Sequence, residues 1–399
     1  MKYIVVLGDG MADYKRGTLG DKTPLMLAKK PAIDLLAKKG QVGLIRTVDE
    51  GLSPGSDVAN LSVIGYDPRQ YYSGRSSLEA LSIGVTMNET DTVLRMNLVT
   101  LSEAEKFEDR TMLDYSAGEI STEEAHELVS AVSKAFADGF IEFFGGTSYR
   151  NCAVIRDTKV DVSFTPPHDI LDKKIGEYLP KGEGNTILNE MIKKSVEVLS
   201  NHPVNLERIS QGKRPANAIW FWGKATKPSL PAFKEKYGLS GAVISAVDLL
   251  KGIAIAAGMD VVNVDGATGT LKTNFAGKAQ ACLDALKNHD YVYIHIEAPD
   301  ECGHQGDAEG KIKAIEKVDF VVDYIVKGLQ KEKTDFCMAV LPDHATPLVL
   351  RTHTSDPVPY IVYNSLREAN SNIGYTEEEA QKGLYLDNGR SLIQLLLKS

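Results

Sequence analysis

Runs of apolar residues of strand length alternate along this chain with amphipathic stretches of helical length. The apolar runs predict strands over residues 3–7, 260–264, 291–296 and 336–341. Apolar positions at helical spacing predict helices over 31–39, 242–257, 278–287 and 311–329. Strands that alternate with helices usually form a parallel sheet covered by helices on its faces. The pattern therefore predicts an α/β fold with a mostly parallel sheet.

The pattern of apolar and polar positions changes between residues 78 and 180. Alternating Thr, Val and Leu positions predict a strand over 92–100, followed by a helix over 121–136 and a strand over 151–156. With 399 residues the chain exceeds the usual size of a single core. We therefore expect 78–180 to be an inserted smaller α+β domain, with 1–77 and 181–399 forming one discontinuous domain. The Gly-rich stretch 181–185 is the nearest thing to a linker.

Composition and charge exclude several classes of protein. Hydrophobic residues make up 43% and charged residues 25%, which is typical of a globular chain. The net charge of −9 disfavours nucleic acid as a partner, because such binding depends on neutralising phosphates. No apolar run reaches the roughly 18 residues of a membrane span, and the N-terminal one is too short for a signal peptide. The four cysteines form no CxxC pair. We expect a cytoplasmic protein with reduced cysteines; its oligomeric state is not predicted.

Polar residues of metal-binding type follow the predicted strands at their carboxyl ends, where ligands of parallel sheets bind. They are Asp9, then Asp300 and His304, then Asp343 and His344, and finally His353 nine residues later. Each taken alone has an ordinary structural role, since an Asp after a strand is usually a turn former or helix cap. Three Asp and three His together supply enough oxygen and nitrogen for two divalent ions, Mn²⁺, Zn²⁺ or Mg²⁺.

A serine that suits phosphoryl transfer lies in the segment SPGSDVANLS. Ser56 is expected where a loop enters a helix, and the free N–H groups of a helix N-terminus hold phosphate. From this segment alone an N-cap role is the favoured interpretation. A hydroxyl bound to a metal loses its proton more readily, however, and becomes a usable nucleophile. Asn60, one helical turn later, is expected to face the same site.

These motifs resemble those of a known protein family. GDGMAD at Asp9, PGSDVANLSVIGYDP around Ser56, EAPDECGHQGD and PDHATP resemble, in this order, the cofactor-independent phosphoglycerate mutases of the archaeal type. That family is part of the alkaline phosphatase superfamily. The resemblance covers nearly the whole chain, including PPHDI at 166–170, PANAIWFWG at 215–223 and DGATG at 265–269. It implies an alkaline phosphatase-like fold.

The resemblance also implies a reaction and a ligand set. One metal would be held by Asp9, Ser56, Asp343 and His344, and the other by Asp300, His304 and His353. Ser56 would take the phosphoryl group from 3-phosphoglycerate and return it to the neighbouring hydroxyl, giving 2-phosphoglycerate without any need for 2,3-bisphosphoglycerate. The chain would then be an isomerase. The insertion would act as a lid, because an open site would let water attack the phosphoserine.

The substrate carries a carboxylate as well as a phosphate, so basic residues are expected to contact it. Arg150, in GGTSYRN, aligns with a Tyr-Arg pair of the family; Lys251 and Arg75 are further candidates, although each is equally compatible with a surface charge. The sequence departs from the family pattern at Asn151, where a His is expected, and at Lys224, where a smaller or neutral residue is expected.

Three alternatives remain open at the level of sequence. A phosphomonoesterase would use the same metals and Ser56 but release phosphate to water. A homoserine kinase-like phosphotransferase of threonine synthesis would need unconventional nucleotide binding, because the chain has no P-loop. A catalytically silent metal-binding module would function without Ser56.

Overall fold

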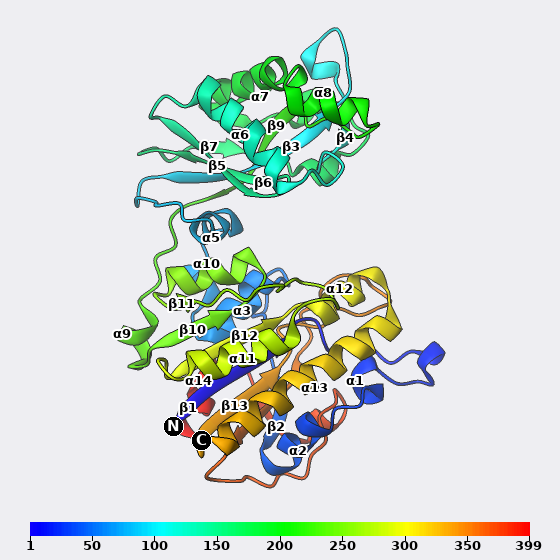
Figure 1. Cartoon of the computed structure of the whole chain (residues 1–399), viewed down its shortest axis with the longest axis vertical. Helices are drawn as coiled ribbons and strands as arrows, with labels where there is room; N and C mark the ends of the chain where they lie inside the picture. The colour runs from blue at the N-terminus through cyan, green and yellow to red at the C-terminus, as the bar shows by residue number, and fades with distance from the viewer. The chain divides into compact units, whose positions relative to one another are not determined.

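The computed structural model describes residues 1–399, and these divide into two compact units (Figure 1). The larger unit comprises Met1–Tyr72 and Ser229–Ser399, and the smaller one comprises Ser73–Pro228. A discontinuous larger domain with an insertion is what the sequence predicts, but the second boundary lies near residue 228 instead of 180. None of the helices is both long enough and apolar enough to cross a lipid bilayer.

An eight-stranded sheet forms the centre of the larger unit. Its order is β11-β10-β12-β1-β13-β14-β2-β15. The strands are β1 (Lys2–Gly8), β2 (Gln41–Ile45), β10 (Gly241–Ile244), β11 (Asp260–Val261), β12 (Tyr291–Ile296), β13 (Phe336–Leu341), β14 (Val358–Asn364) and β15 (Leu384–Leu386). Only β14 runs antiparallel to its neighbours, whereas the other strand pairs are parallel. The predicted mostly parallel sheet is confirmed.

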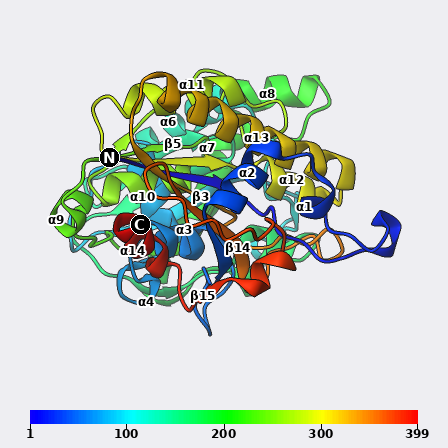
Figure 2. The same ribbon diagram turned by 90° about the horizontal axis from the view of Figure 1, so that it is seen from below.

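Helices cover both faces of this sheet. They are α1 (Pro24–Leu27), α2 (Pro31–Lys39), α3 (Ser56–Ile64), α4 (Pro68–Tyr71), α9 (Phe233–Tyr237), α10 (Asp248–Ala256), α11 (Phe275–Ala285), α12 (Ala298–Gln305), α13 (Ala308–Lys331) and α14 (Arg390–Lys398). The long helix α13 lies between α2 and α11 (Figure 2). Alternate residues of β1, Ile4 and Val6, join Val318 of α13 in one apolar core. Helix α3 packs against both α10 and α14.

Part of the larger unit differs from the prediction. Residues 242–257 are not one helix, because β10 occupies the first part of that run and α10 begins only at Asp248. A short apolar strand that is buried on both faces has no alternation, so periodicity alone does not distinguish it from a helix. The strands β2, β14 and β15, which complete the sheet, are absent from the prediction.

The smaller unit contains a five-stranded antiparallel sheet, a separate pair of antiparallel strands, and helices. The five-stranded sheet is formed by β3 (Thr92–Leu101), β4 (Met112–Asp114), β5 (Ile141–Thr147), β6 (Arg150–Ile155) and β9 (Ala218–Ala225), and the separate pair by β7 (Asp161–Ser163) and β8 (Lys181–Glu183). Its helices are α5 (Arg75–Ser82), α6 (Thr122–Phe136), α7 (Asn185–Ser200) and α8 (Pro203–Ser210). The helix α6 begins with a capping box, in which Ser121 and Glu124 each accept the other's backbone N–H.

The central strand of this sheet explains where the smaller unit ends. β3 pairs with β6 on one side and with β9 on the other, so residues 218–225 belong to the insertion. The stretch 181–185 is not a linker, since it forms β8 and the start of α7. Short 3-10 turns complete the chain at Gly17–Leu19, Phe107–Asp109, Pro167–Ile170, Ile175–Tyr178 and Glu379–Lys382. All four cysteines are buried and none forms a disulfide.

Candidate metal centre

Three neighbouring strands bring the predicted metal residues together. β12, β1 and β13 are adjacent and parallel, and Gly8 is paired with Ile296 while Leu7 is paired with Leu341. Asp9 leaves its strand at the same edge where α12 and the loop after β13 begin. The segments that carry Asp300 and Asp343 therefore meet Asp9, although about 300 residues separate them along the chain.

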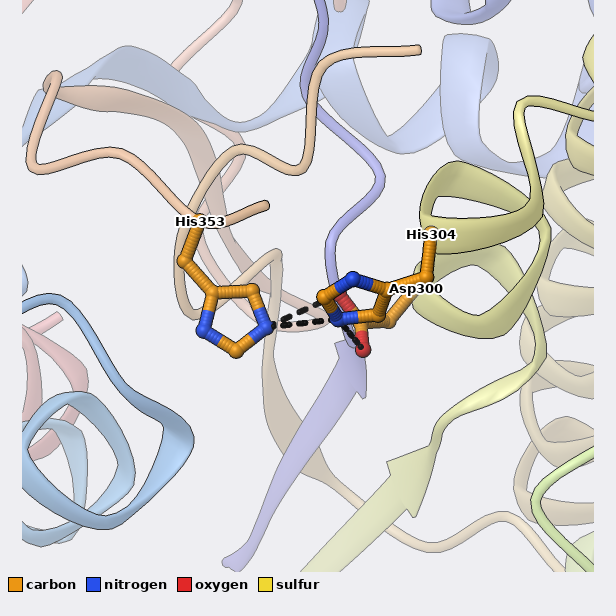
Figure 3. Close-up of side chains that lie close together, drawn as sticks. All are labelled: Asp300, His304 and His353. Atoms are coloured by element: carbon orange, nitrogen blue, oxygen red, sulfur yellow. Dashed lines mark hydrogen bonds and ion pairs between the residues drawn. The ribbon is translucent and has the colours of Figure 1, made fainter. Parts of the chain in front are cut away.

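The first group consists of Asp300, His304 and His353, whose side chains point toward one another (Figure 3). Asp300 and His304 are one turn apart on α12, with Oδ2 and Nε2 3.2 Å from each other. The two imidazole Nε2 atoms are 2.9 Å apart, and that of His353 is 3.5 Å from Oδ1 of Asp300. His304 donates its Nδ1 proton to the carbonyl of Arg351 at 2.9 Å. This bond leaves Nε2 of the neutral ring free to bind a metal.

The second group surrounds Asp9, which is 2% exposed. Oδ1 of Asp9 is buried without any hydrogen-bond partner. It lies 3.6 Å from Nε2 of His344, and that nitrogen lies 3.4 Å from Oδ2 of Asp343. A buried carboxylate oxygen without a partner is costly in free energy, and a bound cation would remove that cost. The donor set of this group therefore fits a divalent metal.

The electrostatics of the cluster favour positive charge. Burial, together with the carboxylates of Asp343 and Asp300, raises the pKa of Asp9 well above its ordinary value. The hydrogen bond that His304 donates to Asp300, and then the charge of that carboxylate, raise the pKa of His304 to about 9, against the opposing effect of burial. Burial lowers the pKa of His344. Three carboxylates in so small and dry a space repel one another, and divalent cations would neutralise them.

Ser56 and Asn60 lie at this cluster, both on α3. Ser56 is the first residue of the helix, and its Oγ is 3.1 Å from Nε2 of His344. The N-cap is the extended Gly55, so the N-cap role favoured from the segment is wrong, and the Ser56 hydroxyl faces the metal residues instead. Asn60 donates to the carbonyl of Ser56 and to Oδ2 of Asp343, both at 2.8 Å. Asn60 therefore lies beside both Ser56 and Asp343.

The basic candidates for substrate binding fall in both units. Lys251 belongs to α10 of the larger unit, where its ammonium is 3.7 Å from a carboxylate oxygen of Asp248. Arg75 and Arg150 belong to the smaller unit. Arg75 donates to Glu79 at 2.8 Å, and the exposed guanidinium of Arg150 lies 4.5 Å above the centre of the Tyr149 ring.

Both departures from the family pattern have local roles in the smaller unit. Asn151 is buried; it accepts the backbone N–H of Gly146 at 3.0 Å and donates to the carbonyl of Tyr149 at 3.1 Å. It therefore supports the turn between β5 and β6, next to Arg150. The ammonium of Lys224 donates to the carbonyl of Val160 at 3.1 Å.

Several polar residues of the cluster are missing from the sequence prediction. His295 lies in β12 and bonds Asp9 through Nε2 at 2.8 Å; burial lowers its pKa to about 4. Thr346 donates its hydroxyl to Oδ1 of Asp300. Lys311 of α13 forms a fully buried ion pair with Asp13 at 2.7 Å. The available signal for His295 was an imidazole inside the otherwise apolar run YVYIHI.

Comparisons with known proteins show the family to which the chain belongs. The family model of 2,3-bisphosphoglycerate-independent phosphoglycerate mutase matches residues 37–205, and that of type I phosphodiesterase / nucleotide pyrophosphatase matches 169–353. A probable mutase of the first kind from Geobacter sulfurreducens is 49% identical over 400 residues, and one from Methanosarcina barkeri is 48% identical over 403. Both alignments cover 100% of each chain. The chain belongs to this mutase family.

The prediction that the chain is an isomerase of this family is therefore confirmed. The Asp and His groups described above are the candidate metal ligands of the chain. A solved structure of a protein from Pyrococcus horikoshii superimposes with a TM-score of 0.84 at 30% identity, covering 100% of this chain and 96% of that one. A cofactor-independent phosphoglycerate mutase from Thermoplasma acidophilum has a TM-score of 0.69 at 24% identity, with coverage of 100% and 99%. This second likeness shows that the fold is shared.

Proposed function

We propose that this chain interconverts 3-phosphoglycerate and 2-phosphoglycerate through a phosphoserine on Ser56. The observation that carries the proposal is the position of Ser56: it opens α3, and its hydroxyl lies 3.1 Å from His344, beside the partnerless oxygen of Asp9. No 2,3-bisphosphoglycerate is needed, because the serine itself carries the phosphoryl group between the two hydroxyls of the substrate.

Two divalent ions, Mn²⁺, Zn²⁺ or Mg²⁺, suit the carboxylate and imidazole groups at this site. We assign Asp9, Ser56, Asp343 and His344 to one ion, and Asp300, His304 and His353 to the other. Bound metals would supply the positive charge that favours the serine alkoxide and the negative transferring phosphoryl group. The hydrogen bonds of Asn60 to the Ser56 carbonyl and to Asp343 hold nucleophile and ligand in one arrangement.

The reaction is then two displacements at phosphorus. Oγ of Ser56 loses its proton and attacks the phosphorus of 3-phosphoglycerate; the bond from phosphorus to the substrate oxygen breaks, and that oxygen gains a proton. The glycerate stays bound and presents its 2-hydroxyl, which loses a proton and takes the phosphoryl group from the serine. The serine oxygen is reprotonated. Free N–H groups in the first turn of α3 bind the phosphoryl oxygens during both steps.

Basic side chains bind the substrate in this proposal, and the smaller unit excludes water. Arg150 is the main carboxylate or phosphate contact, because its guanidinium is exposed and its planar fork matches such groups. Arg75 and Lys251 are further contacts. Ser73–Pro228 acts as a lid that protects the phosphoserine from water, which would otherwise release inorganic phosphate.

Phosphorus NMR tests the proposal. We would incubate 3-phosphoglycerate with the Mn²⁺-loaded protein, chelate the metal and record the spectrum. 2-Phosphoglycerate without free phosphate is the expected result, and Ser56→Ala should abolish it. Ser62→Ala is a matched control, since Ser62 lies on the same helix and its buried hydroxyl has no partner. This variant should stay active.

The other outcomes overturn the proposal in distinguishable ways. Free phosphate as the product would identify a phosphomonoesterase. Unchanged substrate would indicate a different acceptor, and homoserine with a phosphoryl donor would be tried next. A cytoplasmic location and the lack of a nucleic-acid partner stay predictions from the sequence.

A further inference from the structure

His295 occupies a chain of hydrogen bonds that crosses three adjacent strands of the larger unit. It lies on β12, between Ser245 at the end of β10 and Asp9 at the end of β1. The imidazole is 1% exposed. Its Nδ1 is 3.3 Å from the hydroxyl of Ser245, and its Nε2 is 2.8 Å from Oδ2 of Asp9. Both ring nitrogens are therefore engaged.

The proton positions along this chain follow from its last member. An ionised carboxylate only accepts hydrogen bonds, so the proton of the neutral imidazole lies on Nε2 and is donated to Oδ2 of Asp9. Nδ1 then accepts the hydroxyl proton of Ser245, whose Oγ also accepts the backbone N–H of Val247 at 3.0 Å. The ammonium of the fully buried Lys278 donates to the carbonyl of His295 at 3.1 Å, which holds the strand in place under the ring.

This chain separates the two oxygens of Asp9. Oδ2 accepts the imidazole proton, whereas Oδ1 is buried without a hydrogen-bond partner and lies on the side of His344. A carboxylate that was free to rotate would exchange the two oxygens. The hydrogen bond from His295 prevents that rotation, and it selects Oδ1 as the oxygen that faces the metal site.

We propose that His295 is a positioning residue for the metal that Asp9 binds. The hydroxyl of Ser245 holds Nδ1 of the ring in place, and Nε2 of the ring holds the carboxylate of Asp9 in its orientation. The inference rests on the metal assignment in the proposed function. It competes with one other arrangement, in which His295 is itself a ligand together with Asp9 and Asp343, since ligand atoms of these three residues lie within 4.8 Å of one another.

Mn²⁺ binding to the metal-stripped chain tests the inference without any activity measurement. Calorimetric titration gives affinity and stoichiometry for the unaltered chain and for each variant. His295→Leu removes the donor at similar size, whereas the amide of His295→Gln can still donate to Oδ2. Tyr291→Phe is the matched control, because Tyr291 lies on the same strand and its buried hydroxyl has no partner.

We expect His295→Leu to weaken Mn²⁺ binding at one of two sites about 10- to 100-fold, with two ions still bound at saturation. His295→Gln should recover most of the affinity, and Tyr291→Phe should bind as the unaltered chain does. Ser245→Ala should cause a smaller loss by itself and no further loss in the His295→Leu background. A role in packing alone would not produce the rescue by Gln or this dependence on Ser245.

Two results would overturn the inference. Unchanged Mn²⁺ affinity in His295→Leu would show that Asp9 needs no support from the ring. Loss of one bound ion in both His295→Leu and His295→Gln would make His295 a ligand. If His295→Leu does not fold, the comparison of His295→Gln with Ser245→Ala decides, because the inference requires near-normal binding in the first and weakened binding in the second. Failure of the unaltered chain to bind two ions would instead refute the metal assignment itself.

Discussion

The buried ion pair of Lys311 and Asp13 joins two segments that carry metal residues. Lys311 of α13 is fully buried, and its ammonium donates to Oδ2 of Asp13 at 2.7 Å, to the carbonyl of Thr346 at 2.8 Å and to that of Ala12 at 3.2 Å. Asp13 follows Asp9 in the loop after β1, and Thr346 follows His344 in the loop after β13. All three protons of the ammonium are therefore used to hold these loops together.

Lys311→Met keeps most of the apolar volume of the side chain but removes its charge. The carboxylate of Asp13 retains the backbone N–H groups of Tyr14 and Leu348 and loses its cation. Removing one partner of a buried ion pair costs about 3–5 kcal/mol, because the other charge is left uncompensated. With a urea m-value of about 3 kcal/mol/M, this corresponds to a decrease of about 1 M or more in the unfolding midpoint.

Urea unfolding followed by far-UV circular dichroism measures this change. Both tryptophans, Trp220 and Trp222, lie in the smaller unit, so their fluorescence follows that unit separately, and its transition should not move. Lys313→Met is the matched control: Lys313 is on the same helix, with a side chain that is 66% exposed, and we expect a change within about 0.5 kcal/mol.

A second variant separates the loss of charge from the loss of packing. Asp13→Asn combined with Lys311→Met removes both charges, and it should regain part of the lost stability relative to Lys311→Met alone. The reasoning is refuted if Lys311→Met unfolds at the same urea concentration as Lys313→Met, since the ion pair would then contribute nothing to the stability of the larger unit.

Three further predictions concern the backbone near the metals, pH dependence and substrate binding. Gly10 and Gly20 both have positive φ, 63° and 66°, but a Cβ on Gly10 would lie 2.7 Å from Oδ1 of Asp300, whereas Gly20 is in open space. Gly10→Ala should therefore weaken Mn²⁺ binding about 10-fold or more, with Gly20→Ala as the control. Equal Mn²⁺ binding in the two variants would contradict this. Burial raises the pKa of Asp319 to about 6; because this value lies above that of the unfolded chain, the associated stability is present below about pH 4 and lost as pH rises through 6. In urea unfolding the unaltered chain should therefore lose stability relative to Asp319→Asn between about pH 4 and about pH 7 and change little above that, and a difference independent of pH would contradict this. Arg150→Ala should lower kcat/KM about 10- to 100-fold with metal content unchanged, as expected for loss of a charged hydrogen bond; full activity would remove Arg150 from the site.

The candidate metal residues stand out in the sequence because their signal is local. A run of five or six apolar residues followed within two positions by Asp is visible without knowing the fold, as at Asp9 and Asp343. His295 has no such signal, since a His inside an apolar strand is more often an ordinary core residue. Its proposed role depends on Ser245 and Asp9, which contact it from the ends of two neighbouring strands.

The extent of the smaller unit was not predictable for a similar reason. β9 belongs to it only because its residues pair with β3 across about 120 positions of sequence, and pairing partners are not encoded in the local pattern of either strand. The orientation of Ser56 was not predictable from its segment either, because that segment is compatible with Ser56 as the N-cap. In the structure Gly55 takes the N-cap position, and the hydroxyl of Ser56 is directed at His344.

The sequence by itself determined the chemistry available to this protein: the kinds of candidate metal ligand, the serine, the α/β alternation and the order of motifs that marks the family. Only the tertiary structure decided which candidate ligand atoms come together, which oxygen of Asp9 is left without a hydrogen-bond partner, and where the insertion ends. The physical reason is that residue types and periodicity are properties of short segments, whereas strand order, register and burial arise from contacts between segments far apart in the chain.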